Sequence, residues 1–180
     1  MYLLIPGSLL LLLLAAAWHD IRSRRIPNIL VFPGVVAGVL LNALLPQEMG
    51  GLGVLNSVAG LAVGLALLPF YLLRAMAAGD VKFMAMVGAF LGAQDAIGAL
   101  LCVLLAGGVL ALGTAWRQGK LRGLLHNLGM LFAGAAGGSM RQLPVTGGPP
   151  ESVAKSVGKL PYGVAIAAGT AVHLAIAQWG

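Results

Sequence analysis

Two aspartates, Asp20 and Asp80, are the residues best placed in this sequence to perform chemistry. Each adjoins a long apolar segment, and ionisable groups at membrane depth are costly and therefore functional candidates. A pair of nearby carboxyl groups suits peptide hydrolysis, because the two resist simultaneous ionisation. One carboxylate takes a proton from water, which attacks the scissile carbonyl, while the other carboxyl group hydrogen-bonds to the carbonyl oxygen. This reaction requires no metal ion and no bound cofactor.

The same spacing also fits a purely structural role. Ion pairs with Arg22, Arg24 or Lys82 would account for both carboxylates without catalysis, and the spacing alone does not decide between these alternatives. The other acidic residues are weaker candidates, because they lie in short turns or in a polar segment where solvation is the default role: Glu48, Asp95 and Glu151.

The composition indicates that membrane helices position these residues. Of 180 residues, 59% are hydrophobic and 9% are charged, whereas a soluble domain carries about 25% charged residues. The mean hydropathy is +0.96. A soluble enzyme and a disordered chain are both excluded. A spanning helix takes roughly 20 residues, so residues 1–180 have room for about six helices in a single membrane-embedded domain.

The apolar runs predict an all-α, polytopic membrane protein with about six transmembrane helices. Polar breaks separate the runs, and one break is expected at Gln94–Asp95. The first run is expected to be an uncleaved anchor, because arginines follow it, whereas a signal peptide carries its positive charge ahead of the apolar stretch. The six runs cover residues 2–18, 29–45, 52–73, 83–94, 97–115 and 161–179.

The basic residues predict the orientation of these helices. With the N-terminus outside, the cytoplasmic loops are about 19–28, 74–82 and 116–160, and they hold all 11 Lys and Arg residues. This is the distribution that the positive-inside rule favours. Asp20 and Asp80 then share the cytoplasmic boundary, whereas the outer-loop acids lie across roughly 30 Å of hydrocarbon. The net charge of +6 thus reports orientation, and no nucleic-acid partner is expected.

Several other segments carry structural predictions. Residues 121–132 have leucines at helical spacing and predict an amphipathic helix, either in the membrane interface or packed on the bundle. Residues 133–158 are rich in Gly, Pro and Ser and predict a mobile loop. Glycines spaced by four are expected to let helices approach closely. The single cysteine, Cys102, forms neither an internal disulfide nor a CxxC metal site. His19 is expected to have an interfacial role, and His173 a buried hydrogen bond.

Three segments resemble the prepilin peptidases, which are membrane aspartic proteases with six spanning helices. Residues Asp20–Asn28 (DIRSRRIPN) resemble the first catalytic segment of this family. Residues Ala77–Lys82 (AAGDVK) resemble the second segment, usually written GxGDxK. Residues Lys159–Gly163 (KLPYG) are similar to the turn that begins the family's last helix. The three segments occur in the family's order and span nearly the whole chain.

The resemblance implies that Asp20 and Asp80 are the catalytic dyad of a protease that removes the basic leader of prepilins or pilin-like proteins at the cytoplasmic face of a bacterial inner membrane. The short chain resembles the branch that serves tight-adherence (Flp) pili, and N-methyltransferase activity is not expected. Neither a cofactor nor a metal is implied, and membrane lipids are expected partners of the basic loops. Four further residues are candidates for support or substrate contact: Gly79, Lys82, Arg22 and Asn28.

One residue departs from the family pattern, because Ala77 replaces the first glycine of GxGD. A glycine there would permit a positive φ or a close backbone approach, and alanine tolerates the first poorly. The alternative function is a non-catalytic membrane scaffold or carrier, including an inactive peptidase relative, in which the aspartates form ion pairs or a proton relay. Presenilin-like proteases also use a GxGD aspartate, but their Tyr-Asp and Pro-Ala-Leu motifs are absent here, where Trp18 and His19 precede Asp20.

Overall fold

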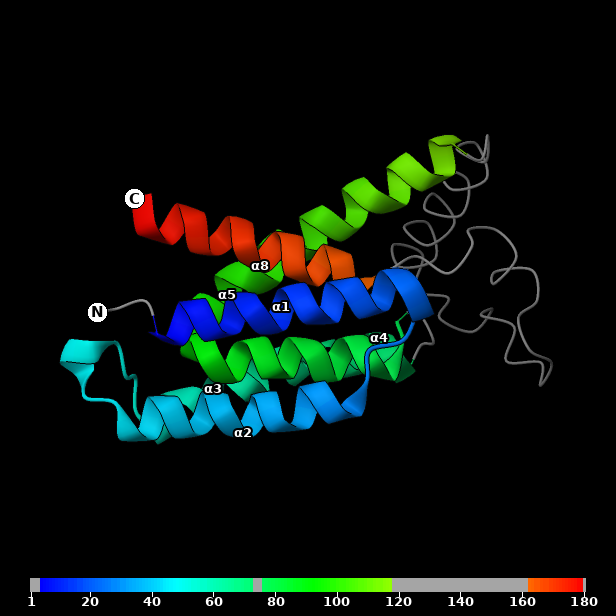
Figure 1. Ribbon diagram of the computed structural model, residues 1–180. Helices are drawn as coiled ribbons and strands as arrows, with labels where there is room; N and C mark the ends of the chain where they lie inside the picture. The colour runs from blue at the N-terminus through cyan, green and yellow to red at the C-terminus, as the bar shows by residue number, and fades with distance from the viewer. Residues whose placement is uncertain (1–3, 73–75, 118–161, 180) are drawn as a thin grey trace, which may run out of the picture. The chain divides into compact units, whose positions relative to one another are not determined.

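The computed structural model describes residues 4–72, 76–117 and 162–179, and every regular element within them is helical (Figure 1). The all-α prediction is therefore confirmed for this part of the chain. The predicted amphipathic helix at 121–132 and the predicted mobile loop at 133–158 lie outside the described residues. The elements in chain order are α1 (Leu4–Ser23), α2 (Asn28–Leu44), η1 (Gln47–Met49), α3 (Val54–Gly64), η2 (Leu65–Leu67), α4 (Leu68–Leu72), α5 (Ala78–Arg117) and α8 (Tyr162–Trp179).

The chain divides into two compact units. The first comprises Met1–Gly107 with Pro161–Gly180, and the second comprises Gly108–Leu160. The described part of the second unit is the last part of α5, where the Thr114 hydroxyl donates to the carbonyls of Leu110 and Ala111. Both candidate aspartates belong to the first unit.

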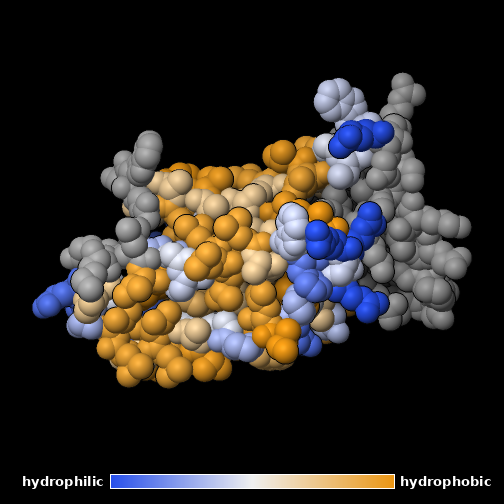
Figure 2. Space-filling model, in the orientation of Figure 1, coloured by the Kyte–Doolittle hydropathy of each residue, from blue (hydrophilic) through white to orange (hydrophobic). Residues whose placement is uncertain are grey.

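The first unit exposes an apolar surface, as a membrane protein does. In α1, Leu9 and Leu13 are fully buried, whereas Leu11 and Leu14 are 70% and 66% exposed, so the helix is apolar on both faces. Figure 2 shows apolar residues over α1 and α2, with hydrophilic residues gathered where α1 ends. Three helical segments are long and apolar enough to cross a membrane, namely Leu4–Ser23, Val54–Leu72 and Ala78–Thr114, and Asn28–Leu44 and Tyr162–Ala177 are shorter apolar helices. The six-span count and the outside N-terminus stay predictions.

Helix α5 consists of two helical segments joined at Gly92. This glycine has φ 76° and ψ 177°, a backbone region that is essentially restricted to glycine. The chain reverses there, and residues 93–107 run back antiparallel to α8 (Figure 1). A Cβ placed on Gly98 would lie 2.4 Å from the His173 ring, and one on Gly107 would lie 3.3 Å from the Tyr162 ring. Gly107 therefore lies at the same end of the unit as the start of α8.

The break lies two residues before the predicted position at Gln94–Asp95, which are helical in the structure. The predicted break between the two runs is therefore present, displaced by two residues, because hydropathy reports where a chain becomes polar and carries no information on a backbone dihedral. The break itself has a clear physical purpose. An uninterrupted helix of 40 residues would be about 60 Å long, twice the roughly 30 Å thickness of the hydrocarbon core.

Glycines bring α2 and α3 close to the first segment of α5, as predicted. A Cβ on Gly60 would lie 2.1 Å from the carbonyl oxygen of Gly88, and a Cβ on Gly88 would lie 2.0 Å from that of Gly60. On α2, a Cβ on Gly34 would overlap the Met86 sulfur at 2.3 Å. Because backbones approach so closely here, these glycines serve packing.

Buried polar side chains complete the hydrogen bonding around the break. Asn42 is 1% exposed, and its Nδ2 donates to the carbonyls of Ala89 and Phe90 at 3.0 and 3.1 Å. Its Oδ1 accepts the amide of Leu52 at 3.1 Å. The Ser57 hydroxyl donates to the Ala89 carbonyl at 2.6 Å. These side chains satisfy carbonyls that the end of the first α5 segment leaves without a helical partner.

Two predicted loops are shorter than expected. Helix α1 continues to Ser23, so residues 19–23 of the predicted loop 19–28 are helical, and α5 begins at Ala78, so residues 78–82 of the predicted loop 74–82 are helical. Polar side chains do not by themselves end a helix. Helix α1 ends where Arg24 adopts a positive φ of 50°, a common way to terminate a helix.

Candidate active site

Asp20 lies in the last turn of α1 and is 5% exposed. Its Oδ2 accepts a hydrogen bond from the backbone N–H of Gly163 at 2.8 Å. The amide of the next residue, Val164, faces the same carboxyl group. Gly163 is in the first turn of α8, where backbone N–H groups have no acceptor within the helix. The Asp20 carboxyl group therefore caps α8 from a neighbouring helix.

Asp80 lies in the first turn of α5 and is 6% exposed. Its Oδ2 accepts the backbone N–H of Ala77 at 3.3 Å, and its own N–H donates to the Ala77 carbonyl at 3.1 Å. The side chain thus satisfies the amide at the residue preceding the helix, as in one half of a capping box. Arg24 is the one described non-glycine residue with a positive φ. Ala77 consequently needs no glycine-like backbone, and alanine fits this position.

The structure brings the two aspartates to one end of the first unit. Asp20 bonds the first turn of α8 through the Gly163 amide. A Cβ on Gly79, the residue before Asp80, would lie 3.6 Å from Ile26, which follows the end of α1. In Figure 1 the end of α1 and the start of α5 lie at the same end of the bundle. Asp95, by contrast, follows the break at Gly92 and lies 3.6 Å from His173 in α8.

Within the described residues, neither aspartate forms an ion pair with a basic side chain. Arg22 stacks on the Trp18 ring at 4.6 Å. Lys82 donates to the Asn28 side-chain oxygen at 3.5 Å and lies over the Phe32 ring. The described residues therefore contain no ion pair between Arg22, Arg24 or Lys82 and either carboxyl group, as the purely structural alternative would require.

The remaining sequence-predicted positions have surface or packing roles. The space around Gly79 would accept a side chain, because a Cβ there would lie 3.6 Å from Ile26, an ordinary van der Waals contact. His19 is exposed, and its Nδ1 hydrogen-bonds with Ser23 and the Arg25 carbonyl at the corner after α1. The predicted buried hydrogen bond of His173 is not present among the described residues, because its Nε2 has no partner at hydrogen-bond distance.

Sequence reasoning missed the role of the Gly163 amide. The Pro-Tyr-Gly segment was recognised by resemblance, but nothing in a side-chain pattern reports a backbone donor. Asn42 and Ser57 were also missed. The signal that could have found them is a polar residue within an apolar helix, which requires a hydrogen-bond partner.

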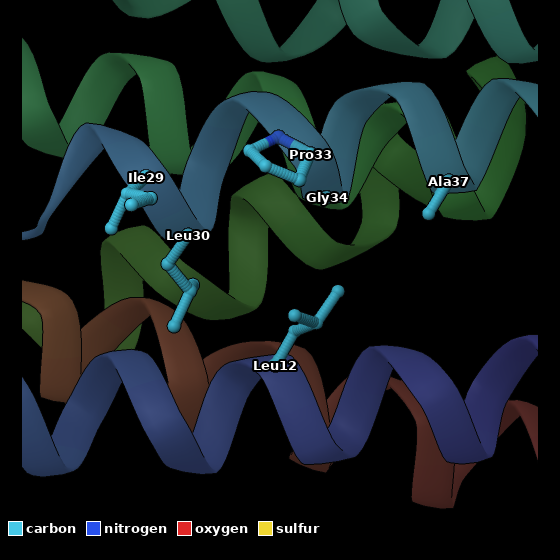
Figure 3. Close-up of a pocket in the computed structure, with 6 residues that line it drawn as sticks. All are labelled: Leu12, Ile29, Leu30, Pro33, Gly34 and Ala37. Atoms are coloured by element: carbon cyan, nitrogen blue, oxygen red, sulfur yellow. The ribbon is translucent and has the colours of Figure 1, made fainter.

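An open hollow of about 430 Å³ lies between α1 and α2 (Figure 3). Its lining carries no titratable group, so it can accommodate apolar groups or lipid but supplies no acid or base. The residues that line it are Leu12, Ile29, Leu30, Pro33, Gly34 and Ala37.

Comparison with known proteins gives one match. No curated protein and no solved structure matches the chain. The model of the type IV leader peptidase family matches residues 8–112, more than half of the chain, and this region contains both aspartates. This match agrees with the buried carboxyl pair and with the apolar helices, and it identifies a peptidase. The chain belongs to the type IV leader peptidase family.

Proposed function

We propose that this protein is an aspartic endopeptidase that removes the basic leader peptide of prepilins or pilin-like proteins at the cytoplasmic face of a bacterial inner membrane. The resemblance to the short family branch suggests a pilin of the tight-adherence type as substrate. The exposed arginines after α1 fit contact with anionic lipid head groups.

The observation that supports the proposal is the presence of two buried carboxyl groups, Asp20 and Asp80, at one end of the first unit, with no ion pair to a basic side chain in the described residues. A single buried carboxylate without a partner is expensive, and two adjacent ones are still harder to ionise together. In the proposed dyad, one carboxyl group serves as the base and the other as the acid. In a peptidase family, that pair is the expected catalyst.

The proposed reaction follows from this pair. The ionised carboxylate removes a proton from a water molecule held between Asp20 and Asp80, and the water oxygen attacks the scissile carbonyl carbon. The protonated carboxyl group donates a hydrogen bond to the carbonyl oxygen as negative charge develops there. Collapse of the tetrahedral intermediate breaks the C–N bond, and the amine leaves with a proton from a carboxyl group.

The test is cleavage of a peptide that carries a basic leader followed by an apolar helix, by Asp20→Asn and Asp80→Asn variants in detergent. Asparagine keeps an oxygen that can accept the Gly163 or Ala77 amide, so both variants should remain folded. General acid and base groups contribute about 10²–10⁴ in rate, so each variant should lose at least about a hundredfold.

The matched controls are Asp95→Asn and Glu48→Gln, which change exposed carboxylates outside the proposed site and should leave the rate within twofold. Full cleavage by both Asp20→Asn and Asp80→Asn would refute the proposed dyad. Loss in only one of them would require a mechanism with a single essential carboxyl group.

A further inference from the structure

We propose that Gly163 is a positioning residue whose amide fixes Oδ2 of Asp20 and so leaves Oδ1 to face the attacking water. The consequence for catalysis rests on the proposed function. The contact itself does not, since it involves only α1 and α8. At Asp80, too, Oδ2 accepts a main-chain amide, that of Ala77.

The first argument is steric. A Cβ on Gly163 would lie 2.7 Å from Oδ2 of Asp20 and 3.0 Å from its Cβ and Cγ atoms. Favourable contacts between carbon atoms lie at about 3.5–4.0 Å. Gly163 is buried, and Asp20 is 5% exposed, so neither group can move into solvent. Any side chain at position 163 must therefore displace the Asp20 carboxyl group.

The second argument is electrostatic. The Gly163 N–H lies at the start of α8, where the free amides and the helix dipole favour a negative group. The hydrogen bond at 2.8 Å satisfies one of these amides and orients the carboxyl plane. Because the Gly163 amide holds Oδ2, the orientation of the carboxyl plane is fixed, and with it the direction in which Oδ1 can meet a water molecule. Catalytic groups gain rate from such fixed orientation.

The contact is tested by thermal unfolding of four proteins in detergent: the wild type, Gly163→Ala, Asp20→Ala and the double variant. Gly163→Ala should lower Tm clearly in the presence of Asp20. Asp20→Ala removes Oδ2 and Cγ, so the Tm decrease caused by Gly163→Ala should shrink to less than half. The matched control is Gly169→Ala in the same helix, where a Cβ would lie 2.5 Å from Val103. Its Tm decrease should be the same in the wild-type and in the Asp20→Ala background.

Equal Tm decreases for Gly163→Ala in both backgrounds would overturn the contact. If Gly163→Ala does not accumulate as folded protein, recovery of folded protein in the double variant supports the contact, and failure to recover overturns it.

The catalytic consequence is tested by kinetics on the leader-bearing peptide. Gly163→Ala should lower kcat at least tenfold and change KM less than twofold, because the substrate-binding surface stays intact. The control Gly7→Ala, which adds a Cβ with nothing within 4 Å, should leave both constants unchanged. An unchanged kcat in Gly163→Ala would overturn the positioning role. Full activity in Asp20→Asn would instead refute the catalytic role of Asp20 in the proposed function and leave the Tm result standing.

Discussion

Replacement of Asn42 by alanine tests whether its buried side-chain hydrogen bonds stabilise the break in α5, where two helical segments join at Gly92 (the α5 hairpin). Asn42 is 1% exposed and links α2 to the end of the first α5 segment. Its removal leaves the Phe90 carbonyl and the Leu52 amide without the partners found in the structure. The Ala89 carbonyl keeps one donor, because Ser57 bonds it at 2.6 Å.

The cost follows from the number of polar groups left unsatisfied. A buried donor or acceptor without a partner costs about 1–3 kcal/mol. Two such groups predict that Asn42→Ala lowers the free energy of unfolding by about 2–6 kcal/mol. Ser57→Ala leaves Ala89 bonded to Asn42 and should cost about 0.5–1.5 kcal/mol. In the double variant the Ala89 carbonyl loses both donors, so the combined cost should exceed the sum by about 1–2 kcal/mol.

The assay is reversible unfolding of the purified protein in mixed micelles with increasing denaturing detergent. Asn28→Ala is the matched control, because this exposed asparagine on the same helix bonds only Lys82 at 3.5 Å among the described residues. Its cost should be under about 0.5 kcal/mol. A cost below about 1 kcal/mol for Asn42→Ala, or strict additivity in the double variant, would refute the assignment of these bonds to the hairpin.

Two further predictions concern glycines of α5. Gly92→Ala should destabilise the protein by at least about 1–3 kcal/mol, because the backbone there has φ 76° and a Cβ would lie 2.8 Å from Leu52; thermal unfolding measures this, and a Tm equal to that of Gly7→Ala would contradict it. Gly79→Ala should keep peptidase activity within about threefold, because its Cβ would meet only Ile26 at 3.6 Å. Loss of cleavage with retained Tm would show that activity requires a glycine beside Asp80 for a reason other than steric room.

The sequence was sufficient to predict the class of fold and that the two aspartates lie at one end of the helical bundle. Counting apolar runs placed the end of the first helix and the start of the fourth at one boundary, and in the structure the end of α1 and the start of α5 lie at the same end of the bundle (Figure 1). Hydropathy could predict this because each run must cross a layer of fixed thickness. The order of the crossings then determines which residues share a face.

Reasoning from hydropathy could not predict features that depend on the backbone conformation. The position of the break at Gly92 depends on a dihedral angle, and the extension of α1 to Ser23 depends on the conformation of Arg24. The anchor of Asp20 depends on the amide of Gly163, which every residue except proline would also possess. Side-chain type predicts such features poorly because the main chain supplies the contact.

The use of main-chain donors for both carboxyl groups affects how this site can evolve. A substitution at position 77 changes a side chain and leaves in place the main-chain amide that bonds Asp80. The first residue of the GxGD segment can therefore vary while the orientation of the Asp80 carboxyl group is kept. Proline is the exception, since it alone lacks an N–H. The occurrence of alanine at this position is therefore compatible with the orientation of Asp80 seen here, whereas a proline there would remove the amide that holds the carboxyl group in place.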